Sequence, residues 1–165
     1  DEVAFAYNLK NERGNWLKIY RPHAGKEDKW KSSIPFIEMH GVGNISGKCD
    51  IGIITKSIKE GAWLNKYITS CVEIVQAEDY TAITEENKKR LLDGCKELYI
   101  SFDSDPKGVS SCVELTKEMG CKYINPPKEL LKYGVTDWTD MCRHYDSPTP
   151  VIEYFNSKGI NNKLT

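Results

Sequence analysis

From residue 51 onward, short apolar segments alternate with segments of helical periodicity, and this alternation constrains the fold more than any other feature. The segments with strand character are 51–55, 71–75, 97–102 and 121–124. The segments with helix character are 58–67, 84–93 and 106–119. Such alternation is typical of a mainly parallel sheet covered by helices on both faces. We therefore expect an α/β fold.

Local signals agree with these helices. Thr84 can cap the helix that follows it, and Asp105 with Pro106 gives an N-cap followed by proline at the first helical position. Apolar residues recur in segment 106–119 with the period of a buried helix face. Near the C-terminus, Thr149 and Gly159 mark the start and end of a further short helix.

The first 47 residues have a different character. Two β-prone runs, 3–7 and 16–20, flank a polar segment and predict a hairpin. Glycines at 41, 43 and 47 suggest a connector. We expect three parts: a small basic β-rich N-terminal subdomain at 1–47, the α/β domain at 48–146, and a C-terminal helix and tail at 147–165.

Charge is unevenly distributed along the 165 residues, whose net charge is −1. Residues 10–31 hold seven basic and three acidic side chains, together with Trp16, Tyr20 and Trp30. A basic segment with aromatic side chains can follow a phosphate backbone or stack a base. An ordinary solvated hairpin is the alternative explanation.

Other features limit the class of protein. The longest apolar runs are strand-sized, far below the roughly 20 residues of a membrane helix, and the N-terminus lacks a signal-peptide pattern. We expect no membrane partner and a cytoplasmic location, in the host cytoplasm for a viral protein. The six cysteines lack zinc-site spacing and are expected to be buried thiols.

The most informative motif is Asp103-Ser104-Asp105, which follows the predicted strand 97–102. Alternate residues of an extended chain project to the same side, and open α/β sheets bind ligands beyond the carboxyl ends of their strands. Two carboxylates there form an oxygen site suited to magnesium. Asp105 also fits a helix cap, and Gly108 permits close approach of the following helix to a ligand or loop.

Two further acidic points lie near the same sheet edge. Asp137 follows the last predicted strand by one loop, and it also fits an N-cap with Asp140 three residues on. Glu60 lies one turn inside the predicted helix 58–67, with Lys56 at the turn before it. Each could be an ordinary solvated or capping residue. Together they would place a lysine and two more acids beside Asp103.

Residues 50–145 resemble the TOPRIM domain of primases, topoisomerases and related nucleases, most closely the primase domains of phage replication proteins. The segment Phe-Asp-Ser-Asp-Pro-Lys-Gly, residues 102–108, looks like the Asp-x-Asp motif of this family with its trailing glycine. Asp137 looks like the downstream acid. Residues 1–47 are similar, more loosely, to the basic subdomain that precedes TOPRIM in primases.

One position departs from the family. Its first motif has a glutamate and a glycine after the strand, with an acid three residues beyond the glycine, and here these positions are Lys56, Ser57 and Glu60. The glutamate is usually assigned acid/base work. Either Lys56 serves as a proton donor to the leaving phosphate, or the domain binds nucleic acid without catalysis. A different alignment of the motif is the third alternative.

The resemblance implies a DNA primase, a magnesium-dependent nucleotidyltransferase that makes short RNA primers from ribonucleoside triphosphates on single-stranded DNA; manganese can substitute. The implied catalytic residues are Lys56, Glu60, Asp103 and Asp105. The implied metal ligands are Glu60, Asp103, Asp105 and Asp137. The implied nucleic-acid or nucleotide ligands are Lys18, Arg21, Lys29, Trp30, Lys31 and Lys107.

The sequence contains no zinc-binding template reader and no P-loop. A replicative helicase and a separate template-reading module are therefore expected partners. Three alternative functions stay open: a TOPRIM nuclease, a catalytically degenerate nucleic-acid-binding module, and a phosphatase with Asp103 as nucleophile. Lys107 and Pro106 fit the phosphatase poorly, because it expects a hydroxyl residue at 107.

Overall fold

The computed structural model describes residues 3–11, 13–35, 37–39, 41, 49–68 and 83–160. The chain divides into two compact units, Asp1–Glu38 and Met39–Thr165. The fold is mixed α/β, with a small antiparallel sheet in the first unit and a three-stranded parallel sheet flanked by helices in the second. The boundary predicted near residue 47 and the strand predicted at 71–75 lie outside the described residues.

The first unit is a three-stranded antiparallel sheet in the order β1 (Phe5–Asn11), β2 (Gly14–Tyr20) and β3 (Trp30–Ser32). The predicted hairpin between β1 and β2 is confirmed, with Phe5 opposite Tyr20 and Asn11 opposite Gly14. The sequence did not predict β3, which has only three residues and pairs with β2.

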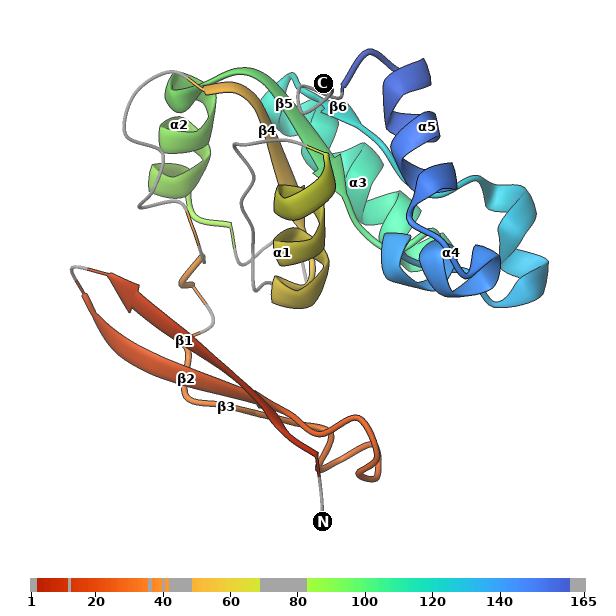
Figure 1. Cartoon of the computed structure of the whole chain (residues 1–165). Helices are drawn as coiled ribbons and strands as arrows, with labels where there is room; N and C mark the ends of the chain where they lie inside the picture. The colour runs from red at the N-terminus through yellow and green to blue at the C-terminus, as the bar shows by residue number, and fades with distance from the viewer. Residues whose placement is uncertain are drawn as a thin grey trace. The chain divides into compact units, whose positions relative to one another are not determined.

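The second unit begins with β4 (Cys49–Thr55), α1 (Ile58–Tyr67), α2 (Glu85–Gly94) and β5 (Cys95–Ser101). It continues with α3 (Pro106–Met119), β6 (Lys122–Tyr123), the 3-10 helix η3 (Lys128–Tyr133), α4 (Trp138–Tyr145) and α5 (Thr149–Ser157). The strands lie in the order β4-β5-β6 and are all parallel. Helix α1 contacts β4, α2 and α3 contact β5, and α4 packs against α5 (Figure 1).

The predicted helix caps are present. The Thr84 side chain accepts a hydrogen bond from the backbone N–H of Asn87 at 3.2 Å, and Asp105 accepts one from Gly108 at 2.7 Å. Asp137 likewise accepts from the N–H of Asp140 at 2.7 Å and begins α4. Each cap satisfies a backbone donor that the first turn of a helix leaves unpaired.

The core of the second unit lies between the parallel sheet and its helices. Strands β4 and β5 contribute fully buried Ile53, Ile54 and Ile100, and α3 contributes Leu115. Trp138 at the start of α4 is also fully buried, and its indole Nε1–H donates to Ser101 Oγ at 2.7 Å. This hydrogen bond satisfies a buried polar group and ties the start of α4 to the end of β5.

No helix among the described residues combines the length and apolar character needed to cross a membrane. Within the same residues the cysteines are thiols: Cys95 and Cys112 are buried, and Cys49, Cys121 and Cys142 are half-buried. The sixth cysteine, Cys71, lies outside the described residues.

Candidate functional site

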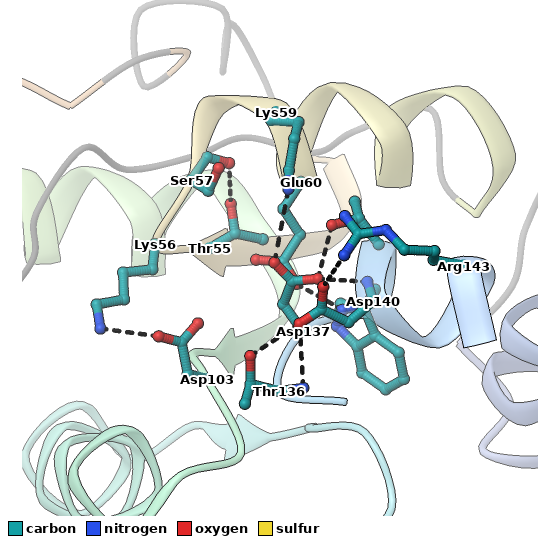
Figure 2. A network of polar contacts seen from close by, with 12 residues as sticks. Thr55, Lys56, Ser57, Lys59, Glu60, Asp103, Thr136, Asp137, Asp140 and Arg143 are labelled. Atoms are coloured by element: carbon teal, nitrogen blue, oxygen red, sulfur yellow. Dashed lines mark hydrogen bonds and ion pairs between the residues drawn. The ribbon is translucent and has the colours of Figure 1, made fainter. Parts of the chain in front are cut away.

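The parallel pairing of β4 and β5 places two predicted site residues side by side. Thr55 and Ser101 are register partners at the carboxyl ends of these strands, so the chain leaves both strands at one edge of the sheet. Lys56 follows β4 directly, and Asp103 lies two residues beyond β5. Their side chains form an ion pair, with Lys56 Nζ 3.1 Å from Asp103 Oδ2 (Figure 2).

A second pair forms between α1 and the start of α4. Lys59 Nζ lies 3.8 Å from Asp137 Oδ2, and the next residue, Glu60, accepts a hydrogen bond from the Trp138 N–H at 3.2 Å. The loop after β5 is tied to the same place, because the Ser104 N–H donates to the Thr136 carbonyl at 2.7 Å. Acids from three segments distant in sequence therefore lie in one region of the molecule, with the Asp103 carboxylate directed at Lys56 (Figure 2).

Glu60 is the most perturbed acid of this cluster. Its side chain lies in the interior, and the residue is only 1% exposed. Burial raises the pKa of Glu60 well above its usual value, the charges of Asp137 and Asp103 raise this pKa further, and the hydrogen bond from Trp138 opposes them. Glu60 is thus a carboxyl group whose environment favours the protonated form in the absence of an added cation.

Asp105 contacts a different part of the molecule from Asp103. Its Oδ1 holds the first turn of α3 through the N–H of Gly108. The same turn lies very close to the loop that contains Asp103. A Cβ atom added at Gly108 would lie 2.1 Å from the Asp103 carbonyl oxygen. The close approach predicted at Gly108 is therefore confirmed, and its partner is the backbone of the Asp103 loop.

The donor set fits magnesium by its chemistry. Glu60, Asp103 and Asp137 supply only carboxylate oxygens, which this ion prefers. The hydrogen bond to Trp138 uses Oε1 of Glu60, and the described contacts give its buried Oε2 no hydrogen bond. Within the described residues no group of three or more His, Cys, Asp or Glu side chains is arranged as a metal cluster, and two of the acids are paired with lysines instead.

The other predicted residues of this unit take different positions. Asp140 accepts from Thr136 Oγ1 at 2.9 Å and pairs with Arg143, so it stabilises the start of α4. Lys107 is exposed in the first turn of α3. The sequence analysis did not single out Lys59. Its position on the predicted helix 58–67, one turn after Lys56 and next to Glu60, could have indicated that it lies near the acids.

One face of the N-terminal sheet carries most of its aromatic rings. The strand register places Phe5, Tyr7, Lys18, Tyr20 and Trp30 on this face. The Tyr20 and Trp30 rings stack with centroids 4.3 Å apart, and Phe5 stacks on Tyr20 at 6.3 Å. Phe5 is half exposed. We call these five residues the aromatic face.

Predicted basic residues lie at the aromatic face and beside it. Lys18 Nζ is 4.7 Å from the centroid of the Trp30 ring, and Lys29 Nζ is 5.8 Å from that of Tyr20. Lys31 instead pairs with Asp28 at 2.7 Å and projects from the opposite face, and Arg21 joins the strands through its backbone N–H to Lys29. Phe5 and Tyr7 were missed, although their alternate positions in a β-prone run predicted a common face.

The comparisons with known proteins add evidence on the fold. No protein-family model matches the chain, and no curated protein matches it in sequence. A solved structure does match: bacteriophage T7 lagging-strand DNA polymerase interacting with primase domains of two gp4 subunits bound to an RNA/DNA hybrid and dTTP. The TM-score is 0.52 at 16% identity, over 81% of this chain and 72% of that chain. The chain therefore has a primase-like fold.

Proposed function

We propose that this chain is the catalytic domain of a TOPRIM-type DNA primase, which joins ribonucleotides on a single-stranded DNA template with magnesium as cofactor. The observation that carries the proposal is that Glu60, Asp103 and Asp137, from three separate segments, lie near enough for the charges of both aspartates to raise the pKa of Glu60. Carboxylates at the carboxyl ends of the strands of an open α/β sheet face the usual ligand-binding crevice. The primase-like fold supports the same assignment.

Phosphoryl transfer depends mainly on positioning and on neutralising charge. Glu60, Asp103 and Asp137, with Asp105 from the same loop, would hold magnesium, which when bound neutralises charge on the triphosphate and orients it. A 3′-hydroxyl would then attack the α-phosphorus: its oxygen forms the new P–O bond, its proton passes to solvent water, and the bond from the α-phosphorus to the pyrophosphate oxygen breaks. Lys56, which forms an ion pair with Asp103, would give a proton to the departing pyrophosphate.

The aromatic face supports a template-binding role for the N-terminal unit. Stacked rings accept bases without sequence preference, and neighbouring lysines attract the phosphate backbone. Lys18 and Lys29 lie over Trp30 and Tyr20, where they would contact phosphates of a strand stacked on this face. A replicative helicase and a template-reading module are further proposed partners, because this chain carries no motif for either role.

The test is primer synthesis. The protein is incubated with single-stranded DNA, labelled ribonucleotides and magnesium or manganese, beside Asp103→Asn and Asp105→Asn variants. Asparagine is chosen because it preserves the cap that Asp105 makes to α3. Asp93→Asn makes the same chemical change on the exposed end of α2 and serves as the matched control.

We expect labelled primers from the wild-type protein and the Asp93 variant, and a loss of at least about 100-fold in the Asp103 variant. Shortening of the template without primers would instead identify the nuclease alternative. Intact nucleic acid with binding that weakens as salt rises would identify a binding module without catalysis.

A further inference from the structure

Two lysines lie among the acids of the proposed metal site. Lys56 pairs with Asp103 at 3.1 Å and Lys59 pairs with Asp137 at 3.8 Å. Lys56 lies just before Ser57, the N-cap residue of α1, and Lys59 lies in the first turn of this helix, three positions after Lys56 (Figure 2). Asp103 and Asp137 therefore each have a cationic partner from the protein itself.

These pairs affect how strongly the site attracts a metal ion. A lysine ammonium and a divalent cation are attracted to the same carboxylate oxygens, and both cannot contact one oxygen at close range. While the pairs persist, two positive charges compensate the two aspartates. A divalent ion must then displace the lysines or bind against their repulsion.

The lysines can leave these positions. About a quarter of the Lys56 side chain and a third of the Lys59 side chain are exposed, so neither ammonium is enclosed by the core. Lysine has a flexible four-carbon stem, and an ion pair at the surface holds it only weakly. Rotation of the stem would carry each ammonium group outward into solvent without a change in the backbone.

We propose that Lys56 and Lys59 occupy the place of the divalent cation in the ligand-free chain and transfer to phosphate oxygens when a metal-bound nucleoside triphosphate enters. This inference rests on the proposed function. Asp103 and Asp137 would hold the metal ion that accompanies the triphosphate. Phosphate oxygens would therefore come close to the two ammonium groups. The lysines then exchange carboxylate partners for phosphate partners, and the metal ion takes over the neutralisation of Asp103 and Asp137.

Two binding measurements test the exchange. The first is the affinity for Mn²⁺ alone, from the electron paramagnetic resonance signal of the free ion. The second is the affinity for ATP at saturating Mn²⁺, from equilibrium dialysis. The variants are Lys56→Met and Lys59→Met, which keep the length of the stem. Lys66→Met in the last turn of α1 is the matched control, because Lys66 contacts the Tyr67 ring.

The two affinities should change in opposite directions. Removing either lysine should raise the affinity for Mn²⁺ by about tenfold. This factor is smaller than unscreened Coulomb repulsion between the ammonium group and Mn²⁺ would give, because solvent screens partly exposed groups. The same variants should bind ATP about tenfold more weakly at saturating Mn²⁺. Lys56→Arg keeps the charge and should bind Mn²⁺ like the wild-type protein, which separates the effect of charge from that of folding.

Unchanged or lower Mn²⁺ affinity in both methionine variants would overturn the inference, as would unchanged ATP affinity. These results would leave the proposed function intact so long as Mn²⁺ binding depends on Asp103. If neither the wild-type protein nor any variant binds Mn²⁺, the metal site of the proposed function fails as well.

Discussion

Gly108 offers the sharpest test of how the fold positions the candidate site. A Cβ atom at this position would lie 2.1 Å from the carbonyl oxygen of Asp103 and 2.9 Å from its carbonyl carbon. These are backbone atoms, which cannot rotate away as a side chain would. To reach ordinary van der Waals contact, the Asp103 loop and α3 must separate by about 1.3 Å.

Two effects of Gly108→Ala oppose each other. Replacing glycine by alanine inside a helix ordinarily stabilises it by about 0.5 to 1 kcal/mol. Overpacking against a fixed neighbour costs about 1 to 3 kcal/mol. Because the neighbour here is backbone, we expect the overpacking to dominate. The free energy of unfolding should fall by about 2 kcal/mol, which corresponds to a decrease in Tm of roughly 4 to 8 °C.

The assay is urea unfolding followed by circular dichroism, with Ser110→Ala as control. Ser110 is exposed on the same helix, so its alanine variant should stay within about 0.5 kcal/mol of the wild-type protein. A shift of about 1 Å in Asp103 should also reduce primer synthesis by about 100-fold. A Gly108→Ala protein more stable than wild type would refute the reasoning, because helix propensity would then outweigh the close approach.

Two other predictions follow from the site and the aromatic face. The pKa of Glu60 is raised in the folded state, so its stabilising contribution is complete below the unfolded value and is lost as pH rises through the folded value. In EDTA, the Glu60→Gln variant should therefore be more stable than the wild-type protein near pH 8 and similar to it near pH 4. Urea unfolding midpoints measured across this pH range test the prediction. Parallel pH profiles of the two proteins would contradict it. Tyr20→Ala should weaken binding of a labelled oligo-dT strand by about 1 to 3 kcal/mol, measured by fluorescence anisotropy, because Tyr20 stacks on Trp30. Leu17→Ala on the opposite face is the control, and an equal loss there would exclude the aromatic face.

The sequence predicted the local structure well because its signals are local. Strand and helix segments, the caps at Thr84 and Asp105, and the turn of the hairpin depend on residues within a few positions of one another. Strand β3 was missed because three residues carry too little periodicity to stand out. It forms because β2 provides a partner, which is a property of the folded sheet.

The sequence predicted that the acids of the candidate site would lie near one sheet edge, but it did not predict their contacts. Parallel strands end at one edge, so Asp103 and the residues after β4 were expected together. The burial of Glu60 depends on Trp138, which is 78 positions away in the chain and reaches it only after α4 packs. The pairing of Lys59 with Asp137 has the same origin. No local pattern encodes such contacts, since they depend on how separate elements meet.

In the structure, the Asp137 carboxylate caps a helix and also contacts a second side chain. From sequence, capping by Asp137 competed with metal binding as an explanation of the same residue. The two oxygens of this carboxylate are used separately: Oδ1 accepts from the Asp140 N–H at 2.7 Å, and Oδ2 lies 3.8 Å from Lys59 Nζ. The cap holds Oδ1 and leaves the second oxygen on the side of Lys59. The cap predicted at Asp137 is confirmed, and because it occupies Oδ1 alone, it is compatible with the metal-binding role that we propose for the second oxygen.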